Sequence, residues 1–334
     1  MKRYVCLLLA GFSLTAWADE FTYKGEPRRE APAPAWSRPD ETSKPGDLIR
    51  VAAYNIEHFT DAVGDGPDRT PERLSRQARM AAELIQEINP QVVLLMEIEN
   101  ATSLAALNQA LTTPFPVGYV TQLGNGAPDE QKLNLAVLSR LPLAEVAEVD
   151  FGPLNGPGRP TRGYLRAVLD LGEGHRLAVY AVHLKSNFGY RPRNVAQRQG
   201  TMKLIAEDAA ALAASDPAVT WEMLVAGDTN VDPEQPEFAG DASLKPLKEW
   251  RDLWRGRPLA ERTTVPTRYG DPALEFPPAC FDRLFASPEL TRKPWQAGEP
   301  QALARGVETR RVIAKPGEGN HISDHYPVYV DLTR

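Results

Sequence analysis

The sequence predicts an α/β sandwich built from mixed β-sheets, and three observations support this. Four largely apolar runs have the length and the β-branched content of strands that are buried on both faces. A segment with helical spacing of apolar residues separates the first two runs, and another precedes the fourth. The later runs follow one another with only turns between them. Early alternation of strands and helices, followed by adjoining strands, favours mixed sheets over a purely parallel, doubly wound sheet.

Residues 1–18 have the pattern of a secretory signal peptide. A short basic region precedes an apolar stretch over residues 5–14, and Ala16-Trp17-Ala18 is typical of a cleavage site. The stretch is too short to span a membrane. Cys6 does not lie at the cleavage boundary, so no stable membrane or lipid anchor is expected. We predict a secreted or periplasmic protein whose mature chain begins at Asp19.

The mature chain divides into an arm and one domain. Residues 19–47 contain five prolines among alanines, serines and charged residues, which is typical of an extended linker or a loosely draped arm. Residues 48–334 show no internal repeat and are predicted to form one catalytic domain. Loss of the signal peptide would leave Cys280 as the only cysteine, so no internal disulfide can form and a small buried residue is expected there. Nothing indicates a protein partner, and we expect a monomer.

A helix joins the first two predicted strands. The run LIRVAAYN ends at Asn55, and the run QVVLLME ends at Glu97. Between them, Thr70 supplies an N-cap and Pro71 suits the first helical turn. Apolar residues then recur at helical spacing until Asn89-Pro90 ends the helix.

The next two strands have the same design. The run RLAVYAVH ends at His183, and the run MLVAGDTN ends at Asp228 and Asn230. A second helix is predicted between them, over about residues 192–214. Downstream, the spacing of Trp250 and Trp254 indicates core residues and not a membrane-inserting hairpin.

Polar residues therefore stand at the ends of all four runs, and ligands of such sheets gather beyond the carboxyl ends of the strands. One common site is expected. Carboxylate and amide oxygens suit a hard cation such as Mg²⁺, with Mn²⁺ as a substitute. The chain has no zinc-type spacing of His and Cys, no Gly-rich phosphate loop and no serine-nucleophile elbow. The predicted chemistry is metal-assisted attack of water on a phosphoester, with histidines for proton transfer.

The segments YNIEHF, LLMEIEN, AVLSRLPL, AVHLKS, AGDTNVDP, FDRLFAS and SDHYPV occur in this order along the chain. Together they resemble the endonuclease/exonuclease/phosphatase superfamily over about residues 50–331, and G-D-x-N with S-D-H-x-P is the most specific part. The superfamily includes pancreatic-type deoxyribonucleases, abasic-site endonucleases, neutral sphingomyelinases and inositol polyphosphate 5-phosphatases. The resemblance implies a four-layered α/β sandwich, two packed mixed β-sheets flanked by helices. HLKS with the following RNVAQRQ is most similar to the branch of bacterial secreted nucleases.

The resemblance implies metal ligands at matching positions. Glu97 would be the principal ligand, with Asn55 beside it, and Asp324 would serve the same region. Whether one or two ions bind is left open. Three positions without a clear family counterpart bear on substrate preference more than on activity: Glu57, Thr229 and Arg283.

The resemblance also implies catalytic residues. Asp228 and Asn230 would hold the attacking water and the phosphate oxygens. His325, oriented by Asp282, would pair with the scissile phosphate or activate water. His183 would lie across the phosphate and support the leaving group. For the stretch around His325 alone, a turn before the last strand is the alternative interpretation.

Two stretches beside His183, residues 155–169 and 176–206, carry basic residues without any acid. In a chain of net charge −6 this asymmetry predicts a phosphate-binding rim. A solvated helix face with a polar loop is the alternative. The candidates for substrate binding are Lys185, Arg166, Arg191 and Arg198, and Lys185 is the strongest because it lies two residues beyond His183 on an extended segment. Residues 288–319 could form a substrate-facing loop or a surface hairpin.

Three functions are compatible with these features. The first is a secreted Mg²⁺-dependent phosphodiesterase, a nuclease that hydrolyses DNA or RNA and leaves a 5′-phosphate and a 3′-hydroxyl, as the resemblance implies. The second is the same chemistry on a phospholipid headgroup or an inositol phosphate. The third is an inactive binding protein on the same fold, which loss of Glu97, Asp228 or His325 would mark; all three are present.

Overall fold

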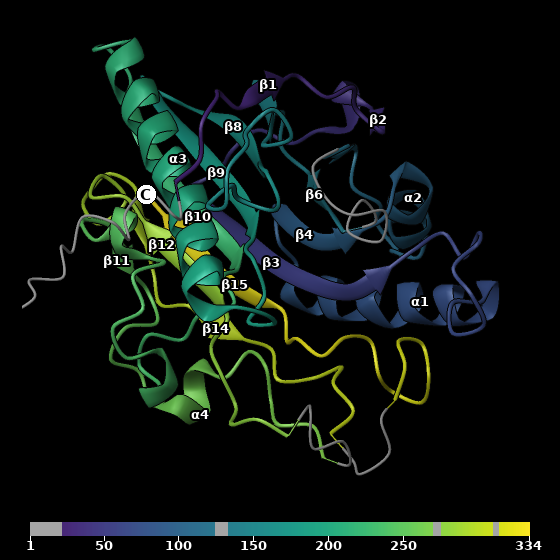
Figure 1. Ribbon diagram of the computed structural model, residues 1–334. Coiled ribbons are helices and arrows are strands. Elements are labelled where there is room, and N and C mark those ends of the chain that lie inside the picture. The colour runs from purple at the N-terminus through teal and green to yellow at the C-terminus, as the bar shows by residue number, and fades with distance from the viewer. Residues whose placement is uncertain (1–21, 124–132, 270–274, 310–313) are drawn as a thin grey trace, which may run out of the picture.

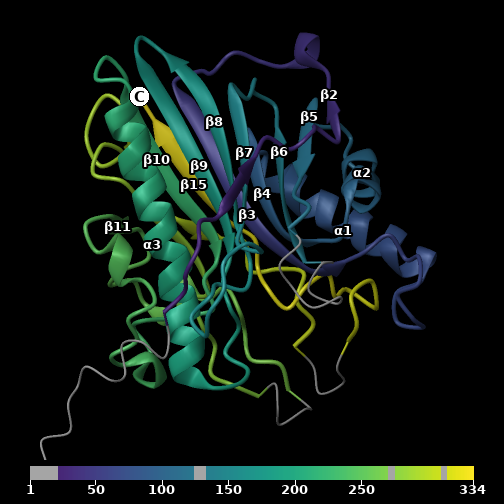
Figure 2. The same cartoon turned by 45° about the horizontal axis from the view of Figure 1, so that its top comes forward.

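A computed structural model of the chain describes residues 22–123, 133–269, 275–309 and 314–334 (Figure 1). Two β-sheets pack face to face, and helices cover both outer faces. Helix α3 (Arg191–Ser215) lies on one side, while α1 (Pro71–Ile88) and α2 (Ala101–Gln109) lie on the other, as Figure 2 shows. This arrangement confirms the expected four-layered α/β sandwich. The expected signal peptide, residues 1–18, lies outside the described residues.

The first sheet has seven strands in the order β1-β7-β8-β9-β10-β12-β11. Strands β9 and β10 are parallel and are connected through α3, whereas the other neighbours are antiparallel. Its strands are β1 (Arg28–Glu30), β7 (Glu145–Asp150), β8 (Tyr164–Gly172), β9 (His175–His183), β10 (Thr220–Asp228), β11 (Arg251–Asp252) and β12 (Asp282–Ala286).

The second sheet follows the order β13-β15-β3-β4-β6-β5-β2, and β14 also pairs with β15. Here β3 and β4 are the parallel pair, connected through α1. Both sheets are therefore mixed, and each parallel pair has a crossover helix. The strands are β2 (Trp36–Ser37), β3 (Leu48–Phe59), β4 (Val92–Ile98), β5 (Val117–Val120), β6 (Asn134–Ser139), β13 (Gln296–Ala297), β14 (Gln301–Ala302) and β15 (Val328–Thr333). In the described part of the chain there are also a short helix α4 (Leu259–Arg262) and 3₁₀ turns at Pro39–Glu41, Pro236–Phe238 and Lys245–Leu247.

The two long helices have the predicted ends. Thr70 caps α1 by accepting a hydrogen bond from the Arg73 N–H, and Asn89 ends it in the left-handed conformation at φ 50°. Helix α3 exceeds its predicted range by one residue at each end. Their apolar faces bury the outer sides of the sheets, and the main core lies between the sheets. Cys280 and Trp254 are both fully buried, as expected.

The proline-rich arm contributes strands to both sheets. Its β1 pairs with β7, and its β2 pairs with β5. A Cβ on Gly118 would lie 2.5 Å from the Trp36 ring, so the indole needs a glycine beneath it. Residues 28–37 thus cross from one sheet edge to the other, as a draped arm and not as a free linker.

The late segment also packs on a sheet edge. Strands β13 and β14 pair with β15, and residues 310–313 lie outside the described part. This pairing is closer to the expected surface hairpin than to a substrate-facing loop. Among the described residues, no helix combines the length and the apolar character needed to cross a membrane.

Candidate active site

Three predicted site residues lie side by side in the seven-stranded sheet. In the β9–β10–β12 row, Asp228 is in register with His183 on one side and with Asp282 on the other. The His183 Nε2 lies 3.4 Å from the Asp228 Oδ2. All three are buried, with at most 5% of the residue surface exposed.

The eight-stranded sheet contributes Asn55 and Glu97 to the same place. The Asn55 Nδ2 donates to the Glu97 Oε1 at 3.1 Å and lies 3.3 Å from the Asp228 Oδ2. This buried amide therefore connects the two sheets. The expected convergence of Asn55, Glu97, His183 and Asp228 on one site is what the structure shows.

Irregular backbone in β3 and β4 orients the Asn55 and Glu97 side chains toward the site. Glu97 has φ 64° and is skipped by the ladder to β6, which passes from Met96 to Ile98. Its partner β3 does not end at Asn55 as expected but continues to Phe59 through a register shift. Within that shift, the His58 N–H donates to the Glu97 Oε2 at 2.7 Å. A hydrophobic run alone carries no signal for such a bulge.

The G-D-x-N segment holds its own polar groups. Asn230, at φ 53°, donates its backbone N–H to the Asp228 Oδ1 at 2.8 Å and its Nδ2 to the Asp228 Oδ2 at 3.1 Å. Gly227 has φ 139°, and a Cβ there would lie 2.2 Å from the Val182 carbonyl oxygen. Thr229 is fully buried and its hydroxyl donates to the Phe281 carbonyl at 2.9 Å. Thr229 therefore anchors the loop from beneath and does not face a substrate.

The S-D-H-x-P segment brings His325 to this group. Its Nδ1 lies 2.7 Å from the Asp282 Oδ2, the contact predicted from the sequence. Its Nε2 lies 3.8 Å from both the Asp228 Oδ2 and the Asp324 Oδ1. Ser323 fixes the approach, because its hydroxyl donates to the Asn55 carbonyl at 2.7 Å and accepts from the His325 N–H at 3.0 Å.

The two histidines have opposite electrostatic surroundings. Burial lowers the pKa of His183 well below its ordinary value, and the nearby Arg162 guanidinium lowers it further. Burial also opposes protonation of His325, but the carboxylates of Asp282 and its neighbours outweigh it and raise the pKa of His325 well above its ordinary value. At neutral pH one imidazole is a neutral group and the other a cation that can donate from Nε2.

Glu97 and Asn55 fit a hard divalent cation. Burial would raise the pKa of Glu97, but His183 and His58, with hydrogen bonds from the His58 N–H and Asn55, lower it to about 2. Glu97 is therefore ionised, and carboxylate and amide oxygens are the donors that Mg²⁺ prefers. The Asn55 Nδ2 faces Glu97, while its Oδ1 accepts from the Glu57 N–H at 3.1 Å and would have to exchange that contact for a cation. For Asp324, burial and then the charge of Glu57 raise the pKa to about 6. Its contact is with His325, so its predicted ligand role stays a prediction.

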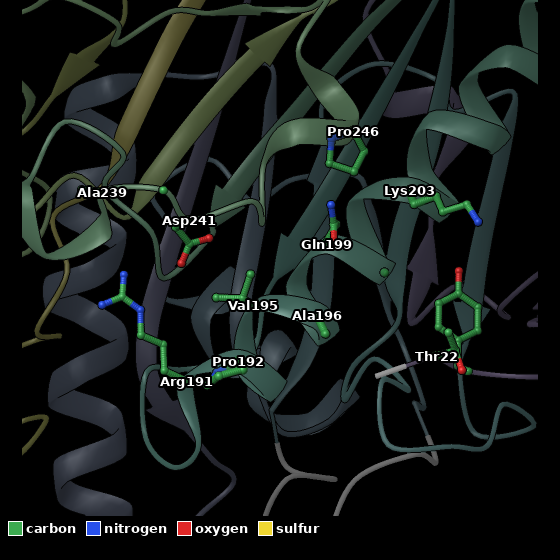
Figure 3. A pocket seen from close by; sticks show the side chains of 13 residues that line it. Thr22, Arg191, Pro192, Val195, Ala196, Gln199, Lys203, Ala239, Asp241 and Pro246 are labelled. Carbon is green, nitrogen blue, oxygen red and sulfur yellow. The ribbon is translucent and has the colours of Figure 1, made fainter. Parts of the chain in front are cut away.

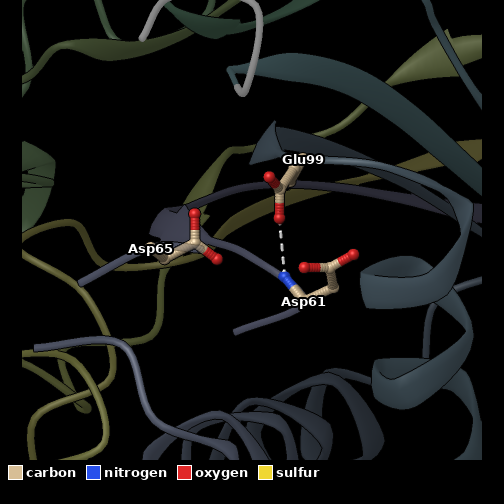
Figure 4. A group of neighbouring side chains, drawn as sticks. All are labelled: Asp61, Asp65 and Glu99. Carbon is tan, nitrogen blue, oxygen red and sulfur yellow. Dashed lines mark hydrogen bonds between the residues drawn. The ribbon is translucent and has the colours of Figure 1, made fainter. Parts of the chain in front are cut away.

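A second acidic group lies close by. Asp61, Asp65 and Glu99 each place a carboxylate oxygen within 4.8 Å of the others, and the Asp61 N–H donates to the Glu99 Oε2 at 2.7 Å (Figure 4). This group could accept a cation. The sequence patterns do not predict this group, and its only signal in the sequence is the position of Glu99 two residues after Glu97.

Two of the four basic candidates are buried in ion pairs. Arg166 is 2% exposed, donates to the Asp208 Oδ2 at 2.8 Å and also pairs with Glu145. Arg198 is 1% exposed and its Nη2 lies 3.0 Å from the Asp241 Oδ2. Neither guanidinium is available to a phosphate from solution. The expected rim does not include them.

The other two candidates lie nearer the surface. The Lys185 Nζ donates to the Ser186 Oγ at 2.9 Å and to the Phe188 carbonyl at 3.2 Å, so it braces its own loop. Arg191 is exposed at the start of α3. With Lys203 and Asp241 it lines a cavity of about 790 Å³ between α3 and the loop before Pro246 (Figure 3). Of the basic side chains in this region, Lys185 stabilises its own loop, and Arg191 is exposed to solvent.

Several supporting residues were missed from the sequence. The Arg162 Nη1 donates to the Leu184 carbonyl at 3.1 Å, directly behind His183. Glu57, which had no assigned role, accepts from the buried His321 at 2.8 Å. Arg283 is fully buried and pairs with Asp252 beneath Asp282. Only the packed structure shows these roles, because each partner is distant in the chain.

Comparison with known proteins decides the family. The sequence pattern of the Endonuclease/Exonuclease/phosphatase family matches residues 52–325. The chain belongs to this family. Members are generally metal-dependent phosphoesterases, and the fold described above is the family's α/β sandwich.

Solved structures share the fold at low identity. TDP2 from D. rerio, complexed with a single-strand DNA product, has a TM-score of 0.59 at 17% identity, over 86% of this chain and 100% of that one. SmcL has a TM-score of 0.59 at 16% identity, over 86% and 99%. Beta toxin from Staphylococcus aureus has a TM-score of 0.58 at 16% identity, over 84% and 99%. No protein of curated function matches the chain by sequence.

Proposed function

We propose that the protein is a secreted, Mg²⁺-dependent phosphodiesterase that hydrolyses nucleic acid. One observation carries the catalytic part: the Asp282–His325 pair, the Asp228–Asn230 loop and the Asn55–Glu97 pair surround one point, although they come from both sheets. A turn-only role for the His325 stretch does not account for a buried, charged imidazole aimed at Asp228. The presence of Glu97, Asp228 and His325 in one place argues against an inactive binding protein.

The residues have complementary tasks in an in-line attack of water on phosphorus. Asp228, held by Asn230, accepts a proton from the attacking water. The Asn230 Nδ2 donates to the Asp228 Oδ2 and to the Leu184 carbonyl, and it would exchange the Leu184 contact for a phosphate oxygen when substrate binds. His325 donates from Nε2 to the phosphate, and Asp282 holds its Nδ1–H. His183 would lie beside the leaving 3′-oxygen, which takes its proton from solvent water. The products would carry a 5′-phosphate and a 3′-hydroxyl.

The metal complements this set. Glu97 and Asn55 would hold Mg²⁺, with Asp324 alongside, and the bound ion would polarise the scissile phosphate and offset its charge. Mn²⁺ prefers similar oxygen ligands and should substitute. The carboxylates that crowd this point otherwise repel an anionic substrate, so activity without a cation is not expected.

Nucleic acid is the substrate that the surroundings favour. Arg191 and Arg193 are exposed at the start of α3, on the segment that follows His183. A chain of phosphates can reach such cations beyond the reacting phosphate, whereas a single headgroup cannot. The D. rerio TDP2 structure with a single-strand DNA product adds that this fold can bind such a chain.

A parallel assay tests the proposal. The mature protein is incubated with Mg²⁺ and, separately, plasmid DNA, RNA, sphingomyelin vesicles and inositol phosphates. We expect cleavage of DNA or RNA that stops in excess chelator and returns with Mg²⁺ or Mn²⁺. Intact nucleic acid alongside turnover of a lipid or a phosphate monoester would overturn the substrate assignment, and full activity in chelator would overturn the mechanism.

Secretion is tested separately. Mass spectrometry of protein recovered outside the cytoplasm should show a mature chain that begins at Asp19. An uncleaved N-terminus in that material would contradict the signal-peptide assignment.

A further inference from the structure

A cavity opens directly beside the catalytic imidazole. It has a volume of about 310 Å³ and borders His325, Asn230 and Asp324 on one side. Its other walls are largely aromatic, formed by Phe188, Phe276 and Phe281. We refer to it as the aromatic cavity. Nothing in the reaction at phosphorus requires such a surface, because water, metal and phosphate are all polar.

One wall is an exposed aromatic ring on a braced loop. Phe188 is 77% exposed, yet its carbonyl accepts from the Asn194 Nδ2 at 3.0 Å. The preceding Asn187 donates from Nδ2 to the Asn230 carbonyl at 2.9 Å and accepts from the buried Arg198 at 3.0 Å. The loop is therefore tied to the catalytic Asn230. The loop is held by side-chain hydrogen bonds while the ring itself stays in water, so the ring is suited to binding and contributes little to the core.

The opposite wall belongs to the core. Phe281 immediately precedes Asp282, and its N–H donates to the Thr264 Oγ1 at 3.0 Å. Its ring meets the edge of Phe238 at 88°, with the ring centroids 5.8 Å apart. Phe276 packs against the same cluster and is partly buried. This wall cannot move without displacing the partner of His325.

We propose that the aromatic cavity receives one unpaired nucleobase of the nucleotide next to the scissile phosphate. This inference rests on the proposed function. Base–aromatic stacking tolerates any base, because every base has a planar π-face. The volume is at the lower end of the roughly 300–1,000 Å³ typical of small-molecule sites, which suits one planar group.

The charged and polar groups at the cavity exclude other occupants. Glu237 and Asp324 both line it, so a second phosphate, beyond the one that His325 would hold, would meet their negative charge. A neutral base can instead offer its amino groups to these carboxylates and to Asn187. A lipid chain would gain nothing from the carboxylates and would bury them at a cost.

This placement has a consequence for the substrate. A base cannot occupy the cavity and remain stacked and paired in a duplex, so it must be single-stranded or extruded. Extrusion of a base from a duplex costs unstacking and unpairing free energy, and this cost is absent in a strand that is already unpaired. We therefore expect single strands to be cleaved faster than the same sequence as a blunt duplex.

The test removes the ring and the base in turn. Wild type and the Phe188→Ala variant are assayed on a single-stranded oligonucleotide with one cleavable phosphodiester, the flanking bonds being nuclease-resistant. Two matched oligonucleotides replace the base on one or the other side of that bond by a baseless spacer. We expect wild type to lose roughly 10-fold in kcat/KM on one spacer substrate. Phe188→Ala should lose a similar factor on the complete substrate and show no further preference for the base.

Controls keep the outcomes separate. Phe188→Trp should retain the preference, and so should Tyr190→Ala, an exposed aromatic two residues away that does not line the cavity. A base preference that survives in Phe188→Ala, or equal cleavage of all three substrates by wild type, overturns this inference while leaving the nuclease assignment intact. If wild type cleaves none of the three substrates, the proposed function itself is wrong. Loss of binding to sphingomyelin vesicles in Phe188→Ala, without an effect on oligonucleotides, would assign the cavity to a lipid instead.

Discussion

The two buried histidines show how the same side chain acquires two different properties. His183 and His325 both lie within 4 Å of Asp228, yet Arg162 stands behind one and Asp282 behind the other. Burial disfavours the charged form of both rings; Arg162 reinforces this at His183, whereas the carboxylates around His325 overcome it. Among the described residues the Asp282 Oδ1 has no hydrogen-bond partner, so the carboxylate is held chiefly by its contact with His325.

The first prediction concerns this pair. His325→Ala should lower kcat by about 10²–10⁴-fold, because a positioned proton donor is lost. Asp282→Asn should also impair turnover, since an amide does not stabilise an imidazolium as a carboxylate does. Single-turnover rates of both variants and of the double variant measure this, and the double variant should be little worse than the worse single one. A His325→Ala protein with a normal melting curve and near wild-type turnover would restore the turn interpretation.

The second prediction separates the two acidic groups. Glu97→Gln should weaken Mg²⁺ or Mn²⁺ binding at the catalytic site by at least about 10-fold, because a neutral amide replaces the ionised ligand. Glu99→Gln, a matched change in the neighbouring group, should leave catalytic metal activation largely unchanged. Titration calorimetry and the metal dependence of turnover provide the measurements. The reverse order of effects would place the catalytic metal at Asp61, Asp65 and Glu99.

Residues differ in how well the sequence predicts them. The Asp282–His325 contact was foreseen because motif residues keep their neighbours across a family. Arg166 and Arg198 were placed on a rim, but both are buried in ion pairs with Asp208 and Asp241. A run of basic residues in the sequence does not show which of them meet an acid from a distant segment. Charge patterns therefore predict surfaces less well than motifs predict contacts.

At the scale of elements, the catalytic side chains lie at or near the ends of the central strands. The regular core of β3, β4, β9 and β10 followed from hydrophobic runs, and the ends of α1 followed from its caps. The bulge that carries β3 on to Phe59 and the left-handed turn at Glu97 were not foreseen. The two- and three-residue edge strands β1 and β2 also escaped notice, since so short a segment has no periodicity. The candidate active site therefore lies where the backbone of β3 and β4 departs from regular strand geometry.

The third prediction concerns Gly227, the second-last residue of β10. Gly227→Ala should destabilise the fold by at least about 2 kcal/mol, because the new Cβ would lie 2.2 Å from the Val182 carbonyl in the neighbouring strand. Gly64→Ala is the matched control: it also has positive φ, but nothing lies within 4 Å of its Cβ. Its cost should be near 1 kcal/mol, from backbone strain alone. Equal unfolding free energies for the two variants in urea would show that the close approach of β9 and β10 is not limiting.

At the scale of the whole molecule, the site occupies the seam between the two sheets. Glu97 and Asn55 come from one sheet, and Asp228 and Asp282 from the other. The Asn55 amide is a direct polar link between them at this point. The carboxylates gathered there repel one another, so the folded state carries an electrostatic cost that a bound cation offsets. Metal binding should therefore stabilise the fold as a whole and not only the reaction.

The last prediction follows from this arrangement. Because the ligands come together only in the folded chain, Mg²⁺ at about 100 times its Kd should add about 2.7 kcal/mol to the free energy of unfolding. Differential scanning calorimetry should show a Tm that rises by several degrees with Mg²⁺ and falls back in chelator. Glu97→Gln should lose most of that rise, whereas Glu99→Gln should keep it. A wild-type Tm that does not respond to Mg²⁺ or Mn²⁺, at concentrations that saturate activity, would contradict this prediction. It would mean that the cation arrives with the substrate and that the His325 imidazolium alone offsets the charge of the carboxylates at the seam.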